Sequence, residues 1–223
     1  MIFGPLSTTT YAVNGVSFDM ARLPPGRFVD GEDEARRELL VSRPFELGLT
    51  QVTQALWRAV TGSRSPSWFS GEDRPVEQVS HDDVQVFLNR LSTFGFKGFR
   101  LPTEAEWAWA ARCGAPTRWP GADRAKPVAV VDEGHPEPVA GLHSDSAGTF
   151  DQSGNVWEWA ADWHQGRPEP GVDPKGPASG ISRILRGSGW SGNPQDARTM
   201  LRLSLGPHYK INSLGVRLLR DIS

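Results

Sequence analysis

The side chains that most often carry catalysis or bind metals are few in this chain, and their spacing fits neither role. The five histidines form no His-x-x-x-His pair and no His-Glu-x-x-His motif, so no pattern typical of a zinc site is present. Ser188 and Ser191 lack neighbouring His and Asp residues in a recognisable nucleophile arrangement. Cys113 is the single cysteine, which excludes an internal disulfide bond and a thiolate metal cluster, and we expect it to be a buried or half-buried, inert thiol.

The composition indicates one globular unit. The chain has 223 residues, of which 38% are apolar and 22% are charged, and its formal net charge is −2. This balance argues against a basic nucleic-acid-binding protein and against an acidic disordered tail. No run approaches the roughly 20 apolar residues of a membrane span, and the first residues carry no secretory signal pattern. We therefore expect a cytoplasmic protein that binds neither nucleic acid nor membranes.

The elements that must position any site are predicted to be short and irregular. The chain has nine tryptophans but only two tyrosines, and its 24 glycines and 18 prolines are dispersed among apolar residues. We infer a loop-rich fold whose core is built from indole rings. No repeat and no linker divides the chain, so we predict a single domain over residues 1–223.

Three helices are predicted in the first half of the chain. The first covers about residues 53–60 and is closed by Gly62. The second begins at Ser80 with a capping box in which Asp83 replaces the usual Glu or Gln, and apolar residues follow at helical spacing. The third, over residues 102–114, begins with a complete Thr-x-x-Glu capping box.

After residue 114 no helical periodicity is sustained. Short β-type runs lie between clusters of Gly, Pro, Asp and Asn, and residues 164–182 have the composition of a surface loop. Early helices and later strands predict an α+β fold with little regular secondary structure and short antiparallel strands. The predicted strands cover residues 11–18, 28–29, 128–131, 157–161, 184–186 and 214–219.

Five segments, in this order, resemble the formylglycine-generating enzyme (sulfatase-modifying factor) family. They read ELGLTQVTQ at 46–54, RPVEQVS at 74–80, FRLPTEAEW at 99–107, GTFDQSGNVWEW at 148–159, and ILRG at 184–187 followed by LGVRL at 214–218. The ordered set covers nearly the whole chain from about residue 16. The resemblance implies a variant of the C-type lectin fold, which agrees with the loop-rich composition.

The resemblance also shows which residues this chain lacks. Oxidases of the family convert a sulfatase cysteine or serine into formylglycine, and they bind copper(I) through two cysteines five residues apart. The matching positions here are Gly192 and Ala197, and neither offers a side-chain ligand. Because copper(I) prefers soft thiolates, we expect no copper and no formylglycine-generating oxidase activity.

Residues 151–158 resemble the structural calcium site of the family. On that resemblance Asp151 and Glu158 supply carboxylate oxygens, while Gly154 and Val156 supply backbone carbonyls. Hard oxygen ligands in an irregular loop suit Ca²⁺, and glycine lets the chain turn so that its carbonyl points inward. The alternative is that Asp151 and Glu158 only cap turns. The second calcium site of the family would need an Asn that residues 129–131 lack, so we expect one structural Ca²⁺.

The resemblance places the functional surface of the fold between residues 190 and 213. Family members encoded beside diversity-generating retroelements carry their variable, ligand-contacting residues in this segment, and the residue types here are compatible with such a history. An exposed apolar cluster among arginines is typical of an interaction site; the alternative is that these side chains pack a core or a partner interface. The predicted ligand-binding residues are Trp190, Ser191, Asn193, Asp196, Arg198, Met200, Leu201, Leu203, Leu205, His208, Tyr209 and Ile211.

Three functional hypotheses follow. The first is a non-catalytic module that binds a protein or small-molecule ligand through residues 190–213, and the missing copper ligands and acid–base pairs favour it. The second is an enzyme with non-copper chemistry in the same pocket, as in relatives that act in siderophore maturation. The third is an accessory domain in a bacterial signalling or defence assembly. Candidate residues for the second are Trp190, Asp196, Arg198, His208 and Tyr209.

Overall fold

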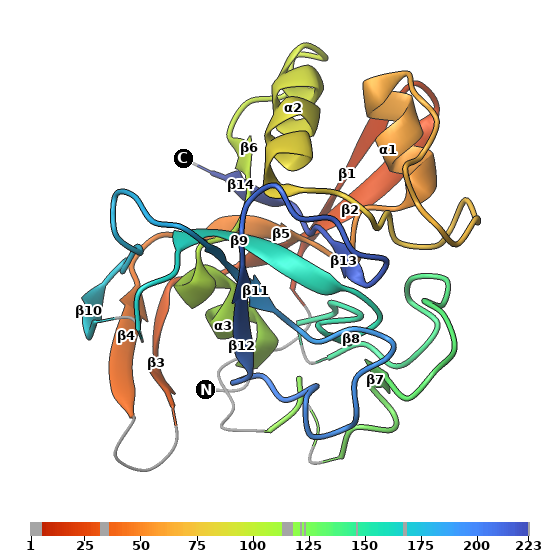
Figure 1. Ribbon diagram of the computed structural model, residues 1–223. Helices are drawn as coiled ribbons and strands as arrows, with labels where there is room; N and C mark the ends of the chain where they lie inside the picture. The colour runs from red at the N-terminus through yellow and green to blue at the C-terminus, as the bar shows by residue number, and fades with distance from the viewer. Residues whose placement is uncertain are drawn as a thin grey trace.

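Three helices and fourteen short strands make up the described part of the molecule (Figure 1). The computed structural model describes residues 6–31, 36–112, 118–120, 122, 124–145, 147–166 and 169–222; Cys113 lies outside them. The helices are α1 (Gln54–Thr61), α2 (His81–Ser92) and α3 (Glu104–Arg112). The strands are β1 (Thr8–Val13), β2 (Val16–Leu23), β3 (Gly26–Asp30), β4 (Arg37–Val41), β5 (Phe45–Gly48), β6 (Phe99–Arg100), β7 (Ala129–Val130), β8 (Ser153–Gly154), β9 (Trp157–Trp163), β10 (Gly171–Val172), β11 (Arg183–Arg186), β12 (Arg202–Leu205), β13 (Leu214–Gly215) and β14 (Leu219–Asp221).

Local sequence explains where the helices begin. Thr53 caps α1, and Ser80 and Asp83 form a complete capping box at the start of α2. Before α3 the Thr103 hydroxyl accepts a hydrogen bond from the Glu106 N–H at 3.2 Å. The three predicted helices are confirmed, although the predicted end of the third at residue 114 lies outside the described residues. No helix in the described ranges is long and apolar enough to cross a membrane.

The strands form four sheets that join distant parts of the chain. One sheet has the order β1-β2-β5-β14-β6, and a second has the order β12-β11-β9-β13. Smaller sheets have the orders β10-β4-β3 and β7-β8. The prediction of short antiparallel strands holds for most pairs, but β4–β10, β7–β8 and β9–β13 are parallel. Long connections rather than tight turns join the members of those three pairs, as parallel pairing requires.

The main core lies between helices α1 and α2 and the two larger sheets (Figure 1). A second apolar cluster lies between α3 and strands β2 to β5. Trp107 and Trp159 are fully buried, and the Trp159 indole donates to the Val79 carbonyl at 3.0 Å. The predicted indole core is thus confirmed for these residues, whereas Trp68 is exposed.

The predicted strand over residues 11–18 is in fact a hairpin of β1 and β2. Its turn is Asn14-Gly15, whose φ angles are 49° and 84°. An Asn-Gly pair adopts such angles at low cost and matches the twist of a two-residue hairpin. The sequence therefore contained the turn signal, and the strand prediction overlooked it. The loop predicted over residues 164–182 likewise contains the short strand β10.

Candidate functional site

The predicted ligand-binding segment, residues 190–213, crosses the molecule in three parts (Figure 1). Residues 190–201 form a loop, β12 is an edge strand of its sheet, and residues 206–213 lead to β13. The predicted site residues are therefore spread along a path and do not form one compact patch.

Main-chain hydrogen bonds fix the first part of this segment. The N–H groups of Asp132 and Glu133 donate to the carbonyls of Gly192 at 2.8 Å and Trp190 at 2.9 Å. The Trp190 N–H in turn donates to the Asn155 carbonyl at 2.7 Å. The loop is thus held against residues 132, 133 and 155 by its backbone.

The last part is fixed in the same way beside α2. The His81 N–H donates to the Pro207 carbonyl at 2.9 Å, and the Gln78 N–H donates to the Ile211 carbonyl at 3.1 Å. The Trp190 indole joins the two ends, because its Nε1 donates to the Asn212 carbonyl at 3.0 Å.

Polar side chains of the loop shape the loop itself. The Asn193 amide oxygen accepts from the N–H groups of Gln195 at 2.8 Å and Asp196 at 3.2 Å, and its amide nitrogen donates to the Asp196 carboxylate at 2.6 Å. Arg198 donates to the Gln195 side chain. Asp196 and Arg198 therefore have structural partners. Among the residues that the structure describes, no three His, Cys, Asp or Glu side chains come together as metal ligands.

The apolar side chains of the segment divide into exposed and half-buried groups. Leu203, Tyr209 and Ile211 are 48%, 51% and 39% exposed, respectively. Leu205 packs against the main core, and Met200 and Leu201 are half-buried. The His208 and Tyr209 rings stack with their centroids 4.6 Å apart. The exposed apolar surface of the segment therefore contains only some of the apolar residues that were predicted to bind ligand.

The two positions that match the copper cysteines are built around small residues. Ala197 is fully buried in the cluster that contains Trp119. A Cβ atom at Gly192 would lie 2.5 Å from the Ser188 hydroxyl oxygen, far closer than packing allows. Ser188 is itself fully buried with a φ of 71°, and its hydroxyl has no hydrogen-bond partner among the described atoms.

A cavity of 860 Å³ opens beside the loop, at Pro194 and Gln195. Apolar residues such as Trp119, Val130 and Leu142 line it together with charged ones. This volume falls within the range of roughly 300–1,000 Å³ that is typical of small-molecule sites.

The predicted calcium ligands do converge, around an atom that the sequence reasoning did not include. The backbone oxygens of Asp151, Gly154 and Val156 and Oε1 of Glu158 all lie within 3.4 Å of the Gln51 amide nitrogen. We call these four oxygens the oxygen cradle. The Asp151 carboxylate makes no hydrogen bond with Gln51: its Oδ2 accepts from the Ala140 N–H at 2.8 Å, and its Oδ1 is buried with no partner among the described atoms.

A buried arginine neutralises Glu158. Arg217 and Glu158 are both fully buried, and the Arg217 guanidinium contacts both carboxylate oxygens at 2.8–3.1 Å. The Trp107 indole donates to the same carboxylate at 2.6 Å. With Gln51 inside the oxygen cradle and Arg217 on its single carboxylate, these residues as arranged do not fit Ca²⁺.

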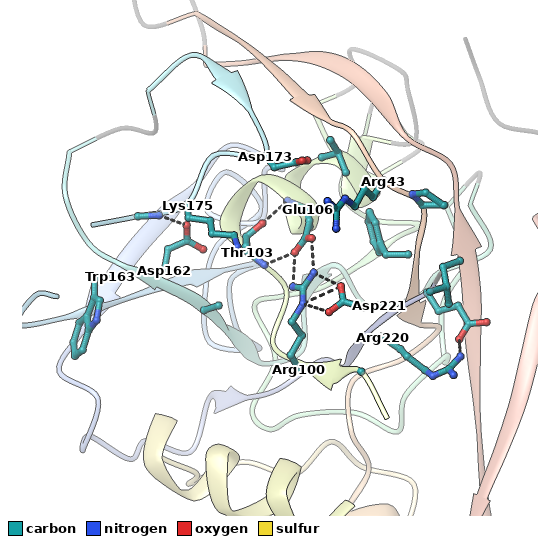
Figure 2. A pocket seen from close by; sticks show the side chains of 18 of the residues that line it. Arg43, Arg100, Thr103, Glu106, Asp162, Trp163, Asp173, Lys175, Arg220 and Asp221 are labelled. Atoms are coloured by element: carbon teal, nitrogen blue, oxygen red, sulfur yellow. Dashed lines mark hydrogen bonds and ion pairs between the residues drawn. The ribbon is translucent and has the colours of Figure 1, made fainter. Parts of the chain in front are cut away.

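A larger cavity of 1,280 Å³ lies at the start of α3, away from residues 190–213 (Figure 2). Figure 2 shows Arg100 at its centre, where the guanidinium joins Glu106 and Asp221, each at 2.7 Å. Burial raises the pKa of Asp162 in the same cavity to about 6, although two backbone N–H groups at 2.7 Å oppose this rise. Its charged lining residues are Arg22, Arg43, Lys97, Arg100, Lys175, Arg183 and Arg220, with Glu46, Glu106, Asp162, Asp173 and Asp221.

No sequence pattern predicts this cavity, because its lining comes from segments spread between residues 22 and 222. The single local signal was the capping box at Thr103 and Glu106, which explains a helix start and predicts no cavity.

Comparison with known proteins finds relatives along nearly the whole chain. Residues 10–222 match the family model of the sulfatase-modifying factor enzyme 1-like domain. The formylglycine-generating enzyme of Streptomyces coelicolor is 32% identical over 195 residues, which cover 76% of this chain and 60% of that enzyme. The chain thus spans less than two thirds of that relative.

Solved structures share the fold over almost their full lengths. Treponema denticola variable protein 1 superposes with a TM-score of 0.89 and 28% identity, covering 96% of this chain and 99% of that one. PvdO from Pseudomonas aeruginosa has a TM-score of 0.83 at 22% identity, covering 96% and 98%, which shows the shared fold. The C-type lectin-like fold implied by the sequence motifs is therefore confirmed, and the chain belongs to the sulfatase-modifying factor enzyme 1-like (formylglycine-generating enzyme) family.

Proposed function

We propose that this protein is a non-oxidase member of its family that binds a protein or small-molecule ligand through the exposed parts of residues 190–213. The observation that carries the proposal is the pair Gly192 and Ala197. These positions match the copper cysteines, and a Cβ atom at Gly192 would force the Ser188 hydroxyl, 2.5 Å away, to shift. Without thiolates at this site the chain has no ligand set suited to copper(I).

Two further observations support a binding role. The likeness to Treponema denticola variable protein 1 extends over 96% of this chain. In addition, Leu203, Tyr209 and Ile211 are exposed on a backbone that main-chain hydrogen bonds hold in place. Exposed apolar and aromatic side chains on a fixed backbone are favourable for binding, since little conformational entropy is lost.

The proposed absence of oxidase activity is tested with copper(I) and a cysteine-containing sulfatase peptide. We expect no transfer of copper(I) from a chromophoric chelator to the protein and no formylglycine in the peptide by mass spectrometry. Stoichiometric copper binding together with formylglycine formation would refute this part of the proposal.

The binding half is tested with a displayed peptide library selected on the wild-type protein. Selected peptides should bind Leu203→Asp and Tyr209→Ala at least about tenfold more weakly in biolayer interferometry, because both changes remove exposed contact area. Val172→Asp is the matched control, since Val172 is a 62% exposed residue of β10, outside the segment. Peptides that bind Leu203→Asp as well as wild type, or that lose binding to Val172→Asp equally, would place the binding surface elsewhere.

A further inference from the structure

Four oxygen atoms meet around one buried amide nitrogen. The Gln51 Nε2 lies 2.9 Å from the Val156 carbonyl, 3.0 Å from Glu158 Oε1, 3.2 Å from the Asp151 carbonyl and 3.4 Å from the Gly154 carbonyl. Gln51 is 1% exposed. A carboxamide nitrogen carries two hydrogens, so four acceptors share two donors. Several oxygens around one central point are the arrangement that a hard cation requires.

The backbone fixes the oxygen cradle independently of Gln51. Asp151, Gly154 and Asn155 all have positive φ angles, and a Cβ atom at Gly154 would lie 2.1 Å from the Val130 carbonyl oxygen. Glycine is therefore required at position 154, and the turn it permits directs its carbonyl into the cradle. Gln51 is 100 residues or more away in the sequence and enters from the segment before α1.

The orientation of the Gln51 amide distinguishes two states of the cradle. With the nitrogen inward, each contact joins a donor to an acceptor. With Oε1 inward, five oxygens would crowd together and repel unless a cation lay among them. In this structure the nitrogen is inward and Oε1 has no partner among the described atoms.

We propose that the Gln51 carboxamide takes the place of a cation in the oxygen cradle, so that the fold of this protein does not depend on calcium. The charge of Glu158 is met by Arg217, so a neutral donor is sufficient at the centre. The inference concerns what holds the fold together and stands apart from the proposed ligand surface.

The first test is made on the wild-type protein. Thermal unfolding followed by circular dichroism should give the same Tm in EDTA and in millimolar CaCl₂ at equal ionic strength. Tb³⁺, an oxygen-seeking probe of calcium sites, should show no tryptophan-sensitised luminescence, although the Trp107 indole contacts Glu158 at 2.6 Å and would sensitise an ion there. A Tm raised by CaCl₂, or saturable luminescence that Ca²⁺ displaces, would overturn the proposal.

The second test restores the requirement for a cation. Gln51→Glu replaces the central nitrogen with an oxygen, so we expect a lower Tm in EDTA, recovery in CaCl₂ and the appearance of Tb³⁺ luminescence. Gln51→Met removes the donor without adding an oxygen, and we expect a lower Tm that CaCl₂ does not restore.

The matched control is Gln54→Glu. Gln54 is also buried, and its amide nitrogen donates to the carbonyls of Phe69 and Pro75, outside the cradle. This variant should lose stability without calcium rescue. A folded Gln51→Glu protein that is insensitive to EDTA and silent with Tb³⁺ would overturn the proposal. If Gln51→Glu does not fold in either buffer, the wild-type comparison decides.

Discussion

Glu77 illustrates how a single buried side chain contributes to the pH dependence of stability. The residue is fully buried; its Oε1 accepts from the Phe69 N–H at 2.9 Å, and its Oε2 has no partner among the described atoms. Burial raises the pKa of Glu77 from 4.5 to about 7. The folded protein therefore holds this proton more tightly than the unfolded chain. The contribution of Glu77 to the free energy of unfolding therefore falls as the pH rises from about 4.5 to about 7.

Glu77→Gln should remove this pH dependence. The variant keeps an acceptor for the Phe69 N–H and carries no charge, so its free energy of unfolding at pH 8 should exceed that of wild type by roughly 1–3 kcal/mol. At pH 4 the difference should nearly vanish, because Glu77 is then mostly protonated in both the folded and the unfolded state. Urea unfolding at both pH values measures the effect, with the exposed Glu38→Gln as control. Equal stabilisation at both pH values would contradict the argument.

At the scale of elements, the turn after β11 is built from two residues that depend on each other. Ser188 adopts a left-handed conformation, which costs a non-glycine residue roughly 1–2 kcal/mol, and its hydroxyl fills the space where a Cβ at Gly192 would lie. A side chain at Gly192 would therefore require the Ser188 hydroxyl to move.

A double-mutant cycle tests this dependence. Gly192→Ala alone should destabilise the protein by about 1–3 kcal/mol through overpacking. Ser188→Gly alone should be neutral or slightly stabilising, since it relieves the backbone and removes an unpaired buried hydroxyl. In the double variant most of the Gly192→Ala penalty should disappear in urea unfolding, which gives a coupling energy of about 1 kcal/mol or more. Strict additivity would show that the two positions do not share the same space.

Local signals predicted the helices, and long-range pairing decided most of the strands. The capping box of Ser80 and Asp83 lies within four consecutive residues, so the sequence shows it directly. In contrast, Leu219 of β14 pairs with Leu47 and with Arg100, each more than a hundred residues away. The oxygen cradle follows the same rule, since residues 151–158 were predicted together and Gln51 was not. Pairings of this kind are fixed by packing rather than by neighbouring residues.

For the whole molecule, one buried guanidinium connects distant parts of the chain. Arg217 pairs with Glu158 and donates to the carbonyls of Gly48, Leu49 and Phe150 at 2.7–3.0 Å. These partners come from the end of β5 and the residue after it, from the loop before β8, and from β9. The Arg217 guanidinium therefore links these segments, and its loss would leave a buried carboxylate and three carbonyl groups with fewer hydrogen-bond donors.

Arg217→Met should destabilise the protein by roughly 3–5 kcal/mol, since it leaves the Glu158 charge buried without its ionic partner. Arg27→Met is the control, because Arg27 and Glu38 form an ion pair whose side chains are 67% and 63% exposed, and such pairs contribute little. Both variants are compared with wild type by thermal and urea unfolding. Similar losses of stability in the two variants would show that the buried Arg217–Glu158 ion pair contributes no more than an exposed one.

The backbone anchoring of residues 190–213 has a consequence for mutational tolerance. Many of the hydrogen bonds that hold this path come from peptide groups, at Trp190, Gly192, Pro207 and Ile211, and such groups do not depend on the side chain. The exposed side chains of Leu203, Tyr209 and Ile211, which make none of these bonds, can therefore be exchanged without refolding the chain that carries them. Such a surface can acquire new specificities by combinatorial substitution while its scaffold stays constant, so it is suited both to rapid natural diversification and to laboratory libraries.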